Sequence, residues 1–157
     1  MSNSLLIWQQ PEVIRWSQIL ANSYQQLLNK KLIDTNNTPE ELAKVLFNAP
    51  FAVVSHNTKA DPIFNYGNKT ALKLWSMNWS KFTKTPSRLS AEPENRATRA
   101  KMLEQAAIQG YIDNYQGIRI SSTGRRFTIA KAVIWSLTDE LEQPCGQAAI
   151  FSDWQWL

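Results

Sequence analysis

The hydrophobic positions near the start of the chain recur at the spacing of an α-helix. Between residues 11 and 33 an apolar side chain returns every three or four positions, and the opposite face is polar. A proline opens this stretch, which suits the first turn of a helix, where a missing N–H costs nothing. The apolar stripe consists of Val13, Trp16, Leu20, Tyr24 and Leu27. We therefore expect an amphipathic helix over residues 11–33.

A second, shorter helix is predicted from a capping signal. Thr38 is followed by a proline and two glutamates, so that its hydroxyl can accept from the backbone N–H of Glu41 at the helix start. Pro50 ends this helix, because the residue before a proline disfavours helical geometry. We assign residues 1–48 to an N-terminal helical extension and residues 49–157 to the main domain.

The main domain begins with two strands and continues with a helical insert. Residues 51–56 and 63–66 are rich in β-branched and aromatic side chains, and a turn separates them. Asn68 then caps a short helix, and Ser90 is expected to cap a longer one that runs to Gln109. The predicted buried stripe of the longer helix is Ala97, Ala100, Leu103, Ala106 and Ala107.

Three further strands are expected after the insert. Residues 110–129, GYIDNYQGIRISSTGRRFTI, read as strand, turn and strand. The segment 127–137 is apolar on both faces and should be central, and 147–154 is the last strand. This order predicts an α+β domain with a five-stranded antiparallel sheet and helices between strands two and three. One sheet face would pack under the insert, and the other would be open to the N-terminal helices or to a partner.

Composition excludes several classes of function. Lys and Arg number 17 against 13 Asp and Glu, and the resulting charge of +4 is dispersed, which argues against nucleic-acid binding. Cys145 and His56 are single residues of their kinds, so no ligand set exists for zinc, haem or an iron–sulfur cluster. No signal peptide and no membrane-spanning apolar stretch is apparent. We expect a soluble, cytoplasmic protein without a membrane partner.

Four segments of the chain resemble a known family. FNYGNKTALKLW, TPSRLSAEPENRATRAKML, GYIDNYQGIRISSTGRRFTI and CGQAAIFSDW, in this order, are similar to the MEKHLA domain, a PAS-like group. The resemblance covers residues 61–154 strongly and the preceding helices less so. It implies a PAS-like fold and a sensory or regulatory binding module without a known catalytic activity. For the plant homeodomain–leucine-zipper members it suggests a role in dimerisation. It transfers no ligand-binding residues, and the cofactor stays unknown.

The candidates for ligand binding come from the residues themselves. Arg119 lies on the opposite strand face from Ile118 and Ile120, so an inward guanidinium could clamp a carboxylate. Aromatic and amide groups would complete a mostly apolar cavity. The candidate residues are Trp75, Tyr115, Arg119, Phe127, Trp135 and Gln147. The plainer interpretation is ordinary core for the aromatics and surface ion pairs for Arg96 and Arg99.

We predict a non-enzymatic sensory or regulatory module that binds a small ligand, mediates protein interaction or dimerisation, or does both. The apolar stripe of the first helix is a candidate homodimer contact, and packing on the chain's own sheet is the equal alternative. Covalent flavin chemistry is not expected, because the helix after Asn68 has no cysteine to place beside a flavin. Two alternatives stay open: a small-molecule enzyme on a PAS-like scaffold, although no nucleophile–base pair stands out, and a single-stranded nucleic-acid binder.

Overall fold

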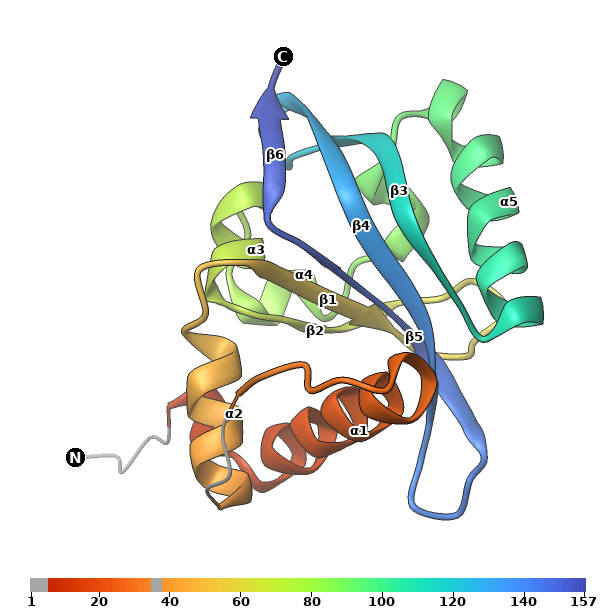
Figure 1. Ribbon diagram of the computed structural model, residues 1–157. Helices are drawn as coiled ribbons and strands as arrows, with labels where there is room; N and C mark the ends of the chain where they lie inside the picture. Colours follow the sequence, from red (N-terminus) through yellow and green to blue (C-terminus); the bar gives the residue numbers. More distant parts are fainter. Residues whose placement is uncertain (1–5, 35–37) are drawn as a thin grey trace.

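A six-stranded antiparallel sheet forms the centre of the protein in the computed structural model, which describes residues 6–34 and 38–157 (Figure 1). The strands run in the order β2-β1-β5-β4-β3, and β6 pairs with β4 beyond the end of β5. Their bounds are β1 Ala52–His56, β2 Phe64–Gly67, β3 Tyr111–Ile120, β4 Arg126–Thr138, β5 Pro144–Phe151 and β6 Asp153–Trp156. The predicted α+β class is confirmed, and β6 is a strand that the sequence pattern did not indicate.

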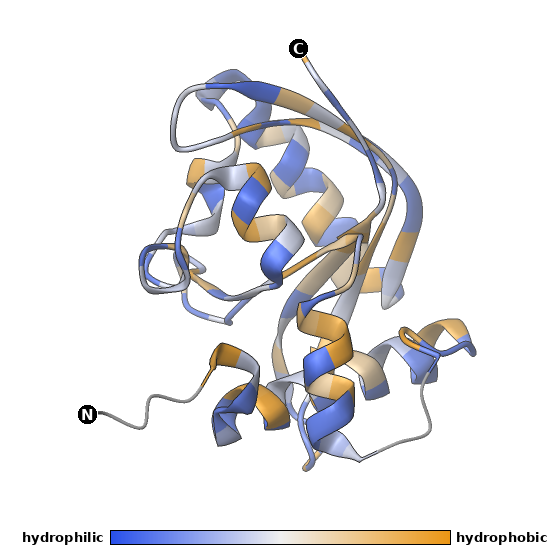
Figure 2. Ribbon diagram, turned by 90° about the vertical axis from the view of Figure 1, so that its left-hand side faces the viewer, coloured by the Kyte–Doolittle hydropathy of each residue, from blue (hydrophilic) through white to orange (hydrophobic). Residues whose placement is uncertain are grey.

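The helices lie on both sides of the sheet. They are the 3-10 turn η1 Ile7–Gln9, α1 Pro11–Leu28, α2 Pro39–Phe47, α3 Lys69–Trp75, α4 Trp79–Phe82, the 3-10 turn η2 Ser87–Ser90 and α5 Pro93–Gln109. Figure 2 shows the insert, α3 to α5, inside the curve of the sheet and the N-terminal helices at its lower end. None of the helices in the described ranges is both long and apolar enough to cross a membrane.

Helix α1 packs its predicted apolar stripe onto the sheet of the same chain. Leu20 is fully buried, and its carbonyl accepts a hydrogen bond of 3.3 Å from the indole N–H of Trp135 on β4. Tyr24 meets the same indole edge to face, with 5.0 Å between ring centroids. The helix ends short of its predicted length, because Asn29 is left-handed with φ 56°. The stripe therefore packs within the chain: Val13, Leu20 and Tyr24 are buried, and Trp16 and Leu27 are half-buried.

Asn68 joins three elements at the start of the insert. Its fully buried carbonyl oxygen accepts from the backbone N–H groups of Val53 and Ala71, both at 3.1 Å, and so caps α3 as predicted. Its amide nitrogen donates to the carbonyls of Leu46 at 3.1 Å and Phe51 at 2.8 Å. The amide thus uses its full hydrogen-bonding capacity. This one side chain ties together the end of α2, the start of β1 and the start of α3.

Helix α5 lies along β3 and is lightly packed (Figure 1). It begins at Pro93 instead of directly after Ser90. The predicted stripe is wrong, because Ala106 is buried and Leu103 half-buried but the three remaining alanines are exposed. The side of α5 that faces the sheet carries Arg99, one helical turn before Leu103, and this arginine stands over a cavity instead of packed side chains.

Two bulges decide which side chains of β3 and β4 face the insert. Asn114 and Lys131 have positive φ angles of 54° and 56°, and the pairing of the two strands shifts near each. An extra residue in one strand moves every later side chain to the other face. Without a bulge, strict alternation along β4 would place the side chain of Trp135 on the same face of the sheet as that of Phe127. Because of the bulge at Lys131, Trp135 faces α1 instead, and Ile134 faces the insert.

Candidate ligand cavity between α5 and the sheet

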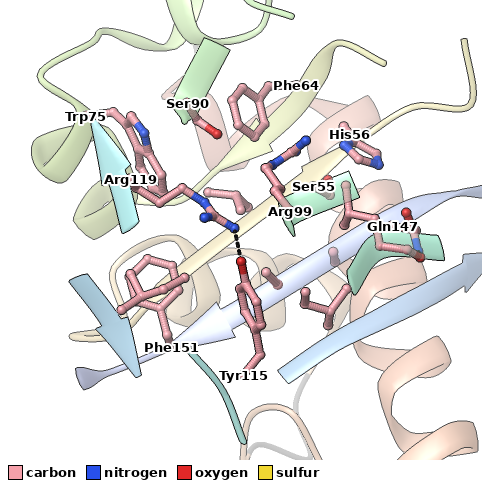
Figure 3. A pocket seen from close by; sticks show the side chains of 16 residues that line it. Ser55, His56, Phe64, Trp75, Ser90, Arg99, Tyr115, Arg119, Gln147 and Phe151 are labelled. Atoms are coloured by element: carbon pink, nitrogen blue, oxygen red, sulfur yellow. Dashed lines mark hydrogen bonds between the residues drawn. The ribbon is translucent and has the colours of Figure 1, made fainter. Parts of the chain in front are cut away.

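A cavity of about 50 Å³ lies between the sheet and the insert (Figure 3). Most of its wall is apolar, and the polar side chains that line it are Ser55, His56, Ser90, Arg99, Tyr115, Arg119 and Gln147. Among the described residues that line it there are two arginines and no aspartate or glutamate. By this measure a water molecule needs roughly 10–15 Å³, so the space suits a group of a few heavy atoms.

Arg119 enters the cavity from β3. The residue is 8% exposed; Nη2 donates to Tyr115 Oη at 3.1 Å, and Nη1 donates to the carbonyl of Ile118 at 3.0 Å. Gly117 makes room for this pair, because a Cβ at that position would lie 2.5 Å from Tyr115 Oη and 3.0 Å from Arg119 Nη1. A guanidinium has five N–H donors, so Arg119 keeps donors that can bind a ligand.

Arg99 reaches the same cavity from α5 and lies beside Arg119 in Figure 3. Within residues 6–34 and 38–157, no carboxylate comes within 4.0 Å of its guanidinium and no acceptor hydrogen-bonds to it. The pKa of Arg99 is lowered to about 10, first by burial and then by the positive charge of Arg119. Arg99 is still charged at neutral pH. The cavity therefore holds two positive charges without an internal counter-charge.

His56 borders the cavity as a neutral group. Its Nδ1 shares a hydrogen bond of 2.8 Å with Ser87 Oγ. The pKa of His56 is lowered to about 4, first by burial and then by the charge of Arg99, while the side chain of Gln147 favours the protonated form. Gln147 Nε2 also donates to the carbonyl of Leu103 at 2.8 Å, which links β5 to α5. This corner of the cavity is polar but uncharged at neutral pH.

His56 and Ser87 are as close as a catalytic base and its nucleophile, but the serine is buried and the pKa of the histidine is low. Ser87 is 1% exposed and does not line the cavity. A histidine whose pKa is about 4 is a weak base at neutral pH. In the part of the chain that the structure describes, no cluster of three His, Cys, Asp or Glu side chains is placed to hold a metal ion.

The structure brings together some of the predicted ligand-binding residues and separates others. Those that line the cavity are Trp75, Tyr115, Arg119 and Gln147. Phe127 is fully buried beside Trp75, with ring centroids 5.2 Å apart, and does not reach the cavity. Trp135 lies on the opposite face of the sheet, because the bulge at Lys131 reverses the faces of the residues that follow it.

Two charged or titratable residues of the cavity were missed by the sequence pattern. Arg99 is not in a surface ion pair, and a signal for its inward position was present: Arg99, Leu103 and Ala106 have the spacing of one helix face. His56 is 6% exposed. Nothing in its neighbourhood along the chain indicates that η2 will cover it.

A family model for the MEKHLA domain matches residues 14–156. The chain belongs to the MEKHLA domain family. Relatives include the homeobox-leucine zipper protein ATHB-8 of Arabidopsis thaliana, 26% identical over 149 residues, and HOX29 of Oryza sativa subsp. indica, 24% identical over 132 residues. These matches cover 94% and 82% of the MEKHLA chain but 18% and 15% of the relatives. The chain thus spans less than a fifth of their length.

This MEKHLA domain has the fold of PAS and light-oxygen-voltage domains. A PAS domain from Colwellia psychrerythraea matches with a TM-score of 0.63 at 16% identity, over 75% of this chain and 95% of that one. An RNA-binding light-oxygen-voltage receptor matches with 0.62 at 14% identity, over 77% and 34%. A light-oxygen-voltage domain studied with a flavin analogue matches with 0.58 at 16% identity, over 74% and 84%. The predicted PAS-like fold is confirmed, and identities this low transfer neither ligand nor partner.

The cavity of this MEKHLA domain does not fit a flavin. Sites for drug-sized ligands occupy roughly 300–1,000 Å³, whereas this cavity has about 50 Å³ and two arginine side chains reach into it (Figure 3). Cys145 packs with the residues that face α1, on the other side of the sheet, so it is not a thiol beside the cavity. The residues that line the cavity suit a smaller and more polar guest.

Proposed function

We propose that this MEKHLA domain is a non-enzymatic sensory or regulatory module that binds a small molecule between the sheet and α5. The observation that carries the proposal is the convergence of polar side chains from separate elements on one small cavity in an apolar core. Buried polar groups normally have partners. The buried indole N–H of Trp75 has none among the described residues, and the half-buried guanidinium of Arg99 has no acceptor there either. The acceptor atoms of a ligand would satisfy such donors.

The output of the module would be a change in self-association or in contact with another protein. The cavity is bounded by α5 on one side and by the sheet on the other. A ligand that binds better to one arrangement of α5 shifts the population toward that arrangement. Since the sheet of the same chain covers the apolar stripe of α1, self-association would use a different surface. A cytoplasmic location stays a prediction.

Native mass spectrometry of the protein purified from its own host tests this proposal. We expect a population that carries one small molecule per chain and loses it on denaturation. Ala149→Leu is the informative variant, because Ala149 lines the cavity and a leucine there would occupy much of the free space. Ala107→Leu, the same change at an exposed position of α5, is the matched control.

The expected result is loss of the bound molecule in Ala149→Leu and its retention in Ala107→Leu. Far-ultraviolet circular dichroism establishes that both variants are folded. A wild-type protein that carries no small molecule contradicts the proposal. So does a folded Ala149→Leu protein that binds the molecule as well as the wild type does.

A further inference from the structure

We propose that the ligand of the cavity is a small organic anion of the carboxylate class, held between the guanidinium groups of Arg99 on α5 and Arg119 on β3. This inference rests on the proposed function and names the chemistry of its ligand. It also assigns the ligand a structural role, because one anion that contacts both arginines bridges the helix and the sheet.

Charge is the first argument for an anion. The two cavity arginines face a lining without acidic residues, among those described, and the nearby His56 is uncharged at neutral pH. Asp61 and Glu92 pair with other arginines: Arg88 Nε lies 3.1 Å from an oxygen of Asp61, and Arg126 Nε lies 3.7 Å from one of Glu92. The protein therefore leaves both cavity charges without a carboxylate partner, and desolvation makes this costly above all for Arg119, which is buried, while Arg99 is half-buried.

Geometry is the second argument, and it favours a carboxylate. A guanidinium presents parallel N–H groups that match the two oxygens of a carboxylate. Arg119 is already oriented by Tyr115 Oη at 3.1 Å, and this neutral partner leaves its charge available. Two guanidinium groups that enter from different walls can share one carboxylate, since its oxygens accept about four hydrogen bonds.

The apolar wall and the volume define the rest of the ligand. Leu103, Ile129, Ile134 and Phe151 line the cavity beside the arginines. They can contact a short hydrocarbon part, which inorganic ions do not have. With about 50 Å³ of free space, that part is limited to a few carbon atoms.

The bridge matters because few side chains of α5 are buried: Met102 and Leu103 pack against the core but stay half-buried. Ala106 is the buried residue of this helix, and Gln147 supplies one hydrogen bond to its backbone at Leu103. Without an anion, the like charges of Arg99 and Arg119 oppose the close approach of α5 and β3. With an anion, both charges are attracted to a common centre. Ligand binding would therefore increase the protection of α5 amides against hydrogen exchange.

Calorimetry and thermal unfolding of the full chain in carboxylate-free buffer test the inference. The probes are acetate, butyrate and succinate, with butyramide as the uncharged analogue and inorganic phosphate as a different anion. The variants are Arg99→Gln and Arg119→Gln. Lys101→Gln is the matched control, because it removes one positive charge from an exposed position of the same helix.

We expect at least one of the three carboxylates to bind saturably and to raise the Tm, and butyramide to bind at least tenfold more weakly. Arg99→Gln and Arg119→Gln should each weaken carboxylate binding at least tenfold, and Lys101→Gln less than twofold. Without ligand, Arg99→Gln should melt no lower than the wild type, because it removes a like-charge repulsion. If the buried Arg119 variant does not fold, Arg99→Gln carries the test.

The outcomes separate this inference from the proposed function. Binding of butyramide as tight as that of butyrate, unchanged in Arg99→Gln, overturns the anionic ligand and leaves a small-molecule cavity standing. If phosphate binds and none of the three carboxylates does, the ligand is not a carboxylate. If no probe binds and native mass spectrometry detects no small molecule on the wild-type protein, both the inference and the proposed function fail.

Discussion

Arg119 and Tyr115 form a pair on β3: Nη2 of the arginine donates to the tyrosine hydroxyl at 3.1 Å, and its guanidinium carbon lies 5.5 Å from the centroid of the tyrosine ring. Gly117 lies between these two residues on the strand, and because it has no side chain, the tyrosine and the arginine can meet at the cavity. A phenol accepts a hydrogen bond without bringing a charge. Tyr115 therefore orients Arg119 and leaves it positively charged.

The first prediction concerns the close approach at Gly117. Gly117→Ala should destabilise the protein by about 1–3 kcal/mol, because the new Cβ would lie 2.9 Å from Tyr115 Cζ and the ring must move. Urea unfolding of the single and double variants measures this. In a Tyr115→Leu background, the same Gly117→Ala change should cost less. Equal costs in the two backgrounds would mean that the tyrosine is not the reason for the glycine.

The second prediction concerns acid pH. His56 has a folded-state pKa of about 4 against an ordinary value of 6.5, so the unfolded chain binds the proton first as the pH falls. The contribution of the neutral histidine is fully present above pH 6.5 and is lost between pH 6.5 and 4. At pH 5 the loss is about 2 kcal/mol.

Comparison with His56→Gln isolates this effect, because carboxylates also titrate at acid pH and the chain has no other histidine. The free energy of unfolding should fall more steeply from pH 7 to pH 5 in the wild type than in the variant. Parallel profiles would show that burial of His56 does not control the acid sensitivity.

The third prediction compares two helix caps. Asn68→Ala removes a cap and also leaves the carbonyls of Leu46 and Phe51 without their amide donor. We expect a loss of at least ~3 kcal/mol, since each unsatisfied buried group costs about 1–3 kcal/mol. Asn78→Ala removes a cap alone, at the start of α4, where Asn78 Oδ1 accepts from Lys81 N at 2.8 Å. It should cost about 1 kcal/mol.

Denaturant unfolding of both asparagine variants provides the measurement. A similar loss for the two would argue that the buried amide of Asn68 contributes nothing beyond capping.

The fourth prediction concerns the apolar stripe of α1. Leu20→Ala should lower the free energy of unfolding by about 2–5 kcal/mol, as expected for a fully buried leucine. Sedimentation should show the same association state for the folded variant and the wild type. Asn22→Ala, at an exposed position of the same helix, should change neither quantity appreciably. A variant that changes its association state but keeps its stability would restore the stripe as a dimer contact.

The positions of helices and strands were largely predictable because their signals are local. Thr38 accepts from the backbone N–H of Glu41 at 3.2 Å and Asn68 from that of Ala71 at 3.1 Å, as their places in the sequence indicate. The order of strands and helices also follows from the pattern, and with it the PAS-like fold. The predicted boundary between residues 48 and 49 stays a prediction.

The candidate site was predictable only in part, because it depends on pairing between distant strands. Arg119 was predicted from its face of one strand, and Trp75, Tyr115 and Gln147 were predicted as aromatic or polar lining groups; all four line the cavity. Trp135 was misplaced because the bulge at Lys131, a residue that seldom adopts positive φ, reverses the faces of β4. Arg99 was missed because its surroundings come from β1, β3 and β5, which are distant from α5 in the sequence.

The order of residues thus accounts for most of the helices, for the caps at Thr38 and Asn68 and for five of the strands, because each of these depends on neighbours within a turn or on alternation along one strand. Motifs along the chain also indicate the MEKHLA family. The cavity and its two arginines, which have no carboxylate partner among the described residues, depend on bulges and on the docking of α5, which set the distances between segments far apart in the chain. Desolvation and like-charge repulsion, which shift the pKa of Arg99, arise after that docking.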